Sequence, residues 1–184
     1  MITAIQEITN LFKENNIPCW IDCGVLLKIY RDGTIKDDDI DLGLFIEDYD
    51  KVLKLLTPIV TIHKWRNQMV FTYKGFQTDL FFCSVDDKYL YLYAYYSDGK
   101  SEGRCNVEFR IKYPKEVYLP LKEITFKNGL NVLVPNDIET NLELHYGNWK
   151  IPIDKPWYYF DIPAWDKTYL ERNINLTDPN GKIL

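Results

Sequence analysis

Four carboxylates crowd into five consecutive positions of this chain, at Asp37, Asp38, Asp39 and Asp41. Two like charges about 4 Å apart repel by about 1 kcal/mol even at high dielectric, and by more when they are partly buried. A bound cation is the usual way to relieve this repulsion. Because carboxylate ligands select hard ions, the residue types indicate a site for Mg²⁺, Mn²⁺ or Ca²⁺.

The residues after the first aspartates alternate between apolar and polar side chains, which predicts a β-strand over residues 39–46. Successive side chains of a strand point to opposite faces, so Asp39 and Asp41 project from the same face. Asp37 continues that row if the strand begins early enough, and Asp38 then points elsewhere. The predicted metal ligands from this segment are therefore Asp37, Asp39 and Asp41.

A further carboxylate, Asp79, lies inside an apolar run that predicts a second strand over residues 76–85. An isolated charge within such a strand is unfavourable unless it has a partner. We therefore predict that Asp79 completes the metal site from a strand beside residues 39–46.

The acidic segment has two other possible interpretations. A calcium-binding loop matches Asp37, Asp39 and Asp41 at its first, third and fifth positions, but Leu42 replaces the required glycine and Asp48 replaces the closing glutamate. A solvated acidic turn without any metal remains an alternative.

Apolar periodicity around the acidic segment predicts an α/β chain of one domain, residues 1–184. Its parts are an N-terminal helix within residues 1–18, a core over residues 19–152 and an aromatic tail, residues 153–184, packed on the surface. Helices are expected over residues 1–16, 24–30, 49–56 and 137–146, and strands over residues 19–22, 39–46, 59–65, 69–73 and 76–85. Asn128-Gly129 predicts a hairpin between residues 124–126 and 132–134. Alternating tyrosines over residues 89–96 predict a packed or edge strand, with a base-stacking platform as the alternative.

Composition narrows the class of protein. The chain has 184 residues, of which 46% are hydrophobic and 27% are charged, and its net charge of −5 disfavours binding to long nucleic acid. The sequence has no apolar run long enough for a membrane span and no signal-peptide pattern, so a cytoplasmic location is the default expectation. The four cysteines lack paired C-x-x-C spacing, which favours free thiols over a zinc site.

Several motifs resemble the signature of the LicD/fukutin-related family. The segments are Trp20-Ile21-Asp22-Cys23-Gly24-Val25-Leu26-Leu27, then Arg31-Asp32-Gly33, then Ile35 through Asp41-Leu42-Gly43, and finally Val134-Pro135 and Leu144-His145-Tyr146-Gly147-Asn148-Trp149 with Pro152. The resemblance implies a nucleotidyltransferase-like fold, a mixed sheet flanked by helices, with acidic strand residues that hold Mg²⁺. It also implies transfer of phosphocholine, ribitol phosphate or a similar phospho-alcohol from a CDP-linked donor to a glycan hydroxyl.

The resemblance also implies roles for individual residues. Asp37, Asp39 and Asp41 match the family's metal-binding aspartates, and Asp79 corresponds more loosely to a later strand carboxylate. Asp39 and Asp41 would hold one or two Mg²⁺ or Mn²⁺ ions, while Asp79 would also orient or deprotonate the acceptor hydroxyl.

The predicted substrate-binding residues are Gly24, Val25, Lys28 and Arg31. Val25 stands where the family has a small hydroxyl residue, and Lys28 stands where the family has a glycine. Lys28 is either a phosphate contact or a solvated lysine. Arg31 is either a phosphate contact, for which its planar fork is suited, or the partner of a nearby aspartate.

Two other functions remain open at the level of sequence. One is nucleotidyl transfer to a protein, an RNA or a small molecule, and the other is a non-catalytic module of the same fold. His145 is interpreted as a helix residue instead of a base, and Trp20 and Trp149 as core residues. Cys23 lies near the expected donor loop, but no neighbouring histidine would make it a nucleophile.

Overall fold

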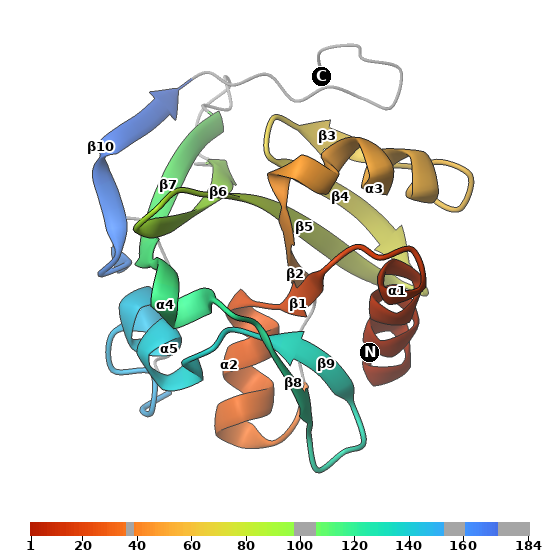
Figure 1. The fold of residues 1–184 in the computed structure, drawn as a ribbon, viewed down its shortest axis with the longest axis horizontal. Helices are drawn as coiled ribbons and strands as arrows, with labels where there is room; N and C mark the ends of the chain where they lie inside the picture. Colours follow the sequence, from red (N-terminus) through yellow and green to blue (C-terminus); the bar gives the residue numbers. More distant parts are fainter. Residues whose placement is uncertain (36–38, 98–105, 153–160, 173–184) are drawn as a thin grey trace.

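The computed structural model describes residues 1–35, 39–97, 106–152 and 161–172, and Figure 1 shows how their elements are arranged. The helices are α1 (Ile2–Glu14), α2 (Cys23–Asp32), α3 (Tyr49–Leu56), α4 (Lys115–Tyr118) and α5 (Ile138–Tyr146), with a short 3₁₀ turn at Ile46–Asp48. The strands are β1 (Cys19–Ile21), β2 (Asp39–Phe45), β3 (His63–Trp65), β4 (Gln68–Tyr73), β5 (Phe76–Val85), β6 (Tyr89–Ser97), β7 (Asn106–Pro114), β8 (Lys122–Thr125), β9 (Asn131–Val134) and β10 (Trp165–Arg172).

In the described part of the chain the strands form one mixed sheet, in the order β10-β7-β6-β5-β2-β1-β9-β8. The hairpin of β3 and β4 branches from it, because β4 also pairs with β5. The pairs β2–β5 and β1–β9 are parallel, and the other pairs are antiparallel. In Figure 1 the helices α2 and α5 lie side by side, near the end of the sheet that carries β8 and β9.

The N-terminal helix α1 forms because its apolar residues recur at helical spacing and so lie on one buried face. Ile5, Ile8 and Phe12 are almost completely buried there. The helix ends at Glu14 with Asn15 as its C-cap, and Asn16 adopts a positive φ of 56° before Pro18, which cannot continue a helix.

The central strand β2 has one face in the core and one face toward the acidic cluster. Ile40, Leu42 and Leu44 are fully buried on the core face, while Asp39 and Asp41 lie on the other face with Gly43. A Cβ atom at Gly43 would lie 2.2 Å from the indole of Trp20, so only glycine leaves room for that ring.

The predicted α/β mixed sheet flanked by helices is confirmed, as are the helices α1, α2, α3 and α5 and the hairpin of β8 and β9. The sequence pattern predicts none of β7, α4 and β10, and β10 pairs antiparallel with β7. The predicted strand over residues 59–65 is shorter, because α3 is followed by a turn before β3.

None of the helices in the described ranges is long and apolar enough to cross a membrane.

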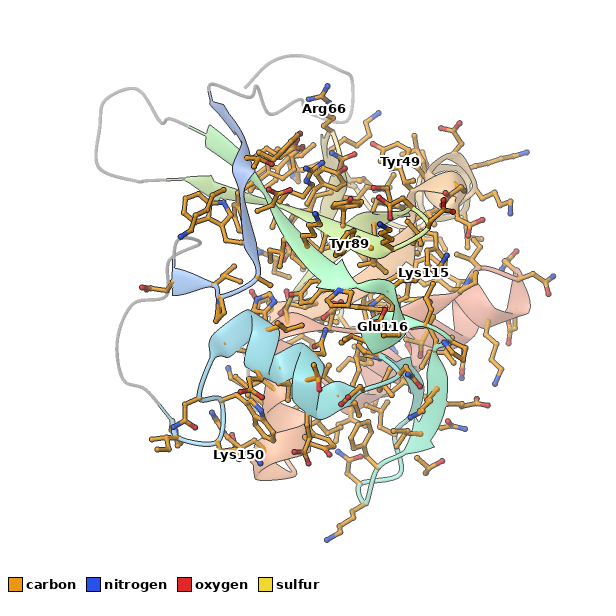
Figure 2. The ribbon with its side chains drawn as sticks, turned by 60° about the vertical axis from the view of Figure 1, so that its left-hand side comes forward. Tyr49, Arg66, Tyr89, Lys115, Glu116 and Lys150 are labelled. Carbon is orange, nitrogen blue, oxygen red and sulfur yellow. The ribbon has the colours of Figure 1, made fainter. Side chains whose placement is uncertain are left out.

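Figure 2 shows Tyr89 on the β6 face turned toward the viewer, where Lys112 lies 3.9 Å above its ring. Arg110 lies 4.6 Å from the ring of Tyr91 and 4.7 Å from that of Tyr169. The tyrosine rings on this face of β6 therefore pack against cationic side chains of β7. This agrees with the prediction of a packed strand.

Candidate metal centre

The parallel pairing of β2 with β5 brings the predicted carboxylates together. Asp41 lies directly opposite Asp79 in the strand register, and Asp39 lies opposite Gln77. One ligand oxygen from each of Asp39, Asp41 and Asp79 can be chosen so that all lie within 4.8 Å of one another. Asp37 falls outside the described residues.

Asp79 is held between two glutamine side chains. Gln68 donates from Nε2 to Oδ1 at 2.7 Å, and Gln77 donates from Nε2 to Oδ2 at 2.9 Å. Burial is the main cause that raises the pKa of Asp79 to about 6; the charge of Asp39 acts in the same direction, and the two amide hydrogen bonds act in the opposite direction. Each carboxylate oxygen keeps a second lone pair, so the hydrogen bonds orient Asp79 without preventing it from binding an ion.

Asp41 is held by the start of α2. The backbone N–H of Gly24 donates to Oδ2 of Asp41 at 3.0 Å, and the backbone N–H of Asp22 donates to the carbonyl oxygen of Asp41 at 3.1 Å. Cys23 lies between them with a positive φ of 46°, which is uncommon for a residue other than glycine. The N-terminus of α2 therefore depends on an uncommon backbone conformation at Cys23, which neighbouring side chains must stabilise.

The fully buried carboxylate of Asp22 supplies that stabilisation. It caps α2 by accepting the backbone N–H of Cys23 at 2.9 Å, and it also accepts Nε1 of Trp20 at 2.8 Å and the hydroxyl of Tyr118 at 2.9 Å. Burial raises the pKa of Asp22, whereas these three donors favour its charged form. Asp22 thus connects β1, α2 and α4, and its own backbone N–H is bonded to Asp41. The sequence pattern does not indicate this role.

The thiol of Cys23 is not an activated nucleophile. Burial raises the pKa of Cys23 well above its usual value, and the charges of Asp22 and Asp41 raise it further. The thiol therefore stays protonated at neutral pH, in agreement with the sequence interpretation. Cys19 and Cys83 are also free thiols, and Cys105 falls outside the described residues.

The three aspartates open into a cavity of about 500 Å³, called here the carboxylate cavity. One wall comes from α2, through Cys23, Gly24, Leu27 and Lys28. The opposite wall comes from the β3–β4 hairpin and from β6 and β7, through Trp65, Gln68, Leu92, Ala94, Tyr95, Phe109 and Ile111. The cavity is therefore polar beside α2 and the aspartates, and largely apolar beside β6 and β7.

A second cavity of about 330 Å³ continues along the same face of α2, lined by Leu27, Lys28 and Arg31. It shares Lys28 with the carboxylate cavity, and its far side includes Trp149. Arg31 forms an ion pair with Asp32 at 2.7 Å and donates to the carbonyl oxygen of Trp149 at 3.2 Å. Both cations thus lie along one helix face that leads to the aspartates.

The other predicted residues are buried, although His145 lines both cavities. Val25 is fully buried in the core, so its side chain lines neither cavity. Trp20 and Trp149 are also buried. His145 is buried on α5, where Nδ1 pairs with the hydroxyl of Tyr113, and burial lowers its pKa to about 3. A neutral, hydrogen-bonded imidazole fits the interpretation of His145 as a helix residue instead of a base.

Comparison with known structures identifies the fold. The crystal structure of the lincosamide antibiotic adenylyltransferase LnuA superposes with a TM-score of 0.53 over 79% of this chain and 85% of LnuA, at 14% sequence identity. The solution structure of the antibiotic-resistance factor ANT(2'')-Ia gives a TM-score of 0.50 over 84% of this chain and 76% of that protein, at 19% identity. The predicted nucleotidyltransferase-like fold is therefore confirmed.

Comparison of sequences identifies the family. The family model described as LicD/FKTN/FKRP, nucleotidyltransferase domain, matches residues 16–137, and the chain belongs to this family. Ribitol-5-phosphate transferase FKTN from Mus musculus is 28% identical over 171 residues, which cover 86% of this chain and 35% of that protein. The chain spans about a third of the length of the curated relatives it matches.

Proposed function

We propose that this chain uses Mg²⁺ or Mn²⁺ to transfer a phospho-alcohol from a CDP-linked donor to a hydroxyl of a glycan. One observation carries the proposal, namely the strand register that brings Asp39, Asp41 and Asp79 together at the base of a cavity. Membership of the family supports this activity class, since the similar FKTN proteins are named ribitol-5-phosphate transferases. Donors of the ribitol-phosphate and phosphocholine types differ only in the alcohol that they carry.

The donor atoms at the cluster suit a hard divalent ion. The three side chains offer only carboxylate oxygens, which Mg²⁺ and Mn²⁺ prefer over softer ligands. Their separation of up to 4.8 Å is close to twice the ligand distance of about 2.0–2.6 Å for such ions, so one ion can reach all three. A bound ion would neutralise phosphate charge and help to hold the reacting oxygens in line.

The wall formed by α2 is the proposed location of the donor phosphates. Lys28 lines both cavities from the middle of this helix, and Arg31 lies one turn further along. Positive side chains on this face balance the phosphate charge that the ion does not neutralise. Gly24 contributes to donor binding indirectly. Its backbone N–H is already bonded to Asp41 and so fixes the position of a proposed metal ligand.

Asp79 is the proposed contact for the acceptor hydroxyl. It lies on β5, away from α2, and its two glutamine partners limit its rotation. A carboxylate fixed in this way can orient an alcohol or receive its proton once the phosphoryl group is transferred. The apolar wall from β6 and β7 would exclude water, which would otherwise compete as the acceptor.

The test is donor turnover by the purified chain with millimolar Mg²⁺ or Mn²⁺, using CDP-ribitol and CDP-choline in the presence of polyol or glycan acceptors. CMP release that disappears in Asp39→Asn, but persists in the exposed control Asp50→Asn, would support the proposal. Consumption of CTP or ATP with release of pyrophosphate would instead identify a nucleotidyltransferase. Turnover that is unchanged in Asp39→Asn would contradict a catalytic role for the cluster.

A further inference from the structure

Two buried polar atoms at the β3–β4 hairpin have no hydrogen-bond partner among the described residues. They are Nε1 of Trp65, a donor, and Oε1 of Gln68, an acceptor. Both side chains line the carboxylate cavity. A buried polar atom without a partner is unfavourable, so such atoms usually meet a ligand or an ordered water.

The two atoms belong to neighbouring side chains with fixed positions. Trp65 lies directly opposite Gln68 in the antiparallel register of the hairpin, so both side chains are on the same face. Gln68 is only 4% exposed, and its Nε2 donates to Asp79 at 2.7 Å. Rotating the amide by 180° would turn Oε1 toward that carboxylate, and two acceptors would then repel each other. The free acceptor is therefore Oε1, as described.

The hairpin that carries this pair is anchored by residues of β6, β7 and β10. Asn67 donates from Nδ2 to the buried carboxylate of Glu108 at 3.0 Å, and its backbone N–H donates to the hydroxyl of Tyr95 at 3.2 Å. The hydroxyls of Tyr95 and Tyr169 also donate to Glu108. Arg66, labelled at the tip of the hairpin in Figure 2, also places its guanidinium 3.9 Å from the carboxylate of Glu108. The contacts of Arg66 and Asn67, which lie between Trp65 and Gln68 in the sequence, thus hold both side chains in position.

We infer that Trp65 and Gln68 form a subsite for a polyhydroxylated ligand, either a polyol or a sugar. Each hydroxyl group both donates and accepts a hydrogen bond, so neighbouring hydroxyls can satisfy one donor and one acceptor at once. The indole ring, 4.6 Å from the ring of Tyr95, supplies an apolar surface for the carbon chain or sugar face. This inference rests on the proposed function and assigns the β3–β4 wall to an alcohol, opposite the phosphates on α2.

The hydroxyls could belong to the alcohol of the donor or to the acceptor, and binding measurements distinguish these sources. Isothermal titration calorimetry with saturating Mn²⁺ would compare CDP-ribitol, CDP-choline and CMP. A second arm would titrate free ribitol into the protein saturated with Mg²⁺ and CMP, and would follow binding by NMR. Neither arm requires turnover, so both remain informative if no donor is consumed.

The test variants are Trp65→Phe, which removes only the indole N–H and part of the ring, and Gln68→Met, which removes the amide. Gln77→Met is the matched control, because Gln77 also donates to Asp79 but is exposed, so its amide oxygen is accessible to water. Trp165→Phe controls for the loss of an indole that does not line this cavity.

If the subsite holds the donor's alcohol, both test variants should weaken CDP-ribitol binding by about fivefold or more, the factor for one lost hydrogen bond, with CDP-choline and CMP unchanged. If it holds the acceptor, donor binding should be unchanged and ribitol binding should fall by a similar factor. Either result supports the subsite. Test variants that behave like their controls in both arms would overturn it. Failure of the proposed function would appear separately, as nucleotide binding that does not depend on Asp39.

Discussion

Asp41 and Asp79 lie directly opposite each other where β2 and β5 pair in parallel, and both are more than nine-tenths buried. Asp39 completes the cluster from the same face of β2. Three carboxylates in this arrangement destabilise the metal-free protein, because their charges repel and two of them are shielded from water. A bound cation would relieve this repulsion, which leads to the first prediction.

Replacing Asp79 by asparagine should separate stability from metal binding. The metal-free variant should have a higher thermal midpoint than the wild type, since one of three crowded charges is removed. Its affinity for Mn²⁺ should fall by at least about 100-fold, because even partners of metal ligands typically contribute about 10–100-fold. Calorimetric titration and thermal denaturation check the two effects. The exposed control Asp50→Asn should change neither, and an Asp79→Asn variant with wild-type affinity would exclude this residue as a ligand.

Asp22 is predicted to act on the metal site through the backbone of α2. In Asp22→Asn, an NH₂ group would face one of the N–H or O–H donors that the carboxylate now accepts. The strained Cys23 would then be held less firmly, and the Gly24 bond to Asp41 should weaken. We expect Mn²⁺ affinity to fall by about tenfold.

The control for Asp22 is Tyr118→Phe, which removes one donor and leaves the cap on Cys23 intact. This variant should lose stability with little change in Mn²⁺ affinity. Equal losses of affinity in both variants would mean that Asp22 stabilises the fold without positioning the site.

Gly43→Ala should damage the protein much more than Gly129→Ala. The new Cβ at residue 43 would lie 2.2 Å from the buried indole of Trp20, whose hydrogen bond to Asp22 would then be displaced. Overpacking and loss of that bond should together lower the free energy of unfolding by about 2–4 kcal/mol. At Gly129 no atom lies within 4 Å of the added Cβ. Only the positive φ of 86° is unfavourable for alanine there, and it should lower the free energy of unfolding by about 1–2 kcal/mol. Urea denaturation of both variants measures the difference, and equal losses would contradict the steric explanation.

His145 should make the stability of the protein sensitive to acid. Burial lowers its pKa to about 3 from the ordinary value of 6.5, so the folded protein keeps a neutral imidazole while the unfolded chain becomes protonated. The contribution is fully present above about pH 6.5 and is lost as the pH falls toward 3, by up to about 1.4 kcal/mol per pH unit.

The test compares urea denaturation at about pH 5 and about pH 7, on either side of the ordinary histidine pKa. His145→Phe should be less stable at neutral pH, because the bond to Tyr113 is lost, but should show a smaller loss in acid. The chain has two histidines, and the exposed His63 is the control, since His63→Phe should keep the wild-type dependence. An unchanged acid loss in His145→Phe would show that other groups cause it.

Some of the candidate site could be predicted from local patterns. Strand alternation places Asp39 and Asp41 on one face whatever the neighbouring strand is, so their proximity follows from the sequence. The position of Asp79 does not follow in the same way, because alternation does not determine which strand pairs with β2 or in which register. Its place opposite Asp41 is a property of the folded sheet.

Other functional residues carry no local signal. Gln68 is an uncharged residue at the start of a strand, and its importance depends on the contact with Asp79 across a strand pair. Asp22 follows a strand of only three residues, and three elements must assemble before its donors meet it. β10 was missed because its charged and polar residues are not typical of a strand, and its pairing with β7 depends on contacts distant in sequence.

The most direct test of the metal centre is anomalous diffraction from a crystal soaked in Mn²⁺. The predicted result is a Mn²⁺ peak within about 2.0–2.6 Å of oxygens from Asp39, Asp41 and Asp79. A well-ordered crystal with no peak at this cluster at millimolar Mn²⁺, or with Mn²⁺ bound only elsewhere, would contradict the account.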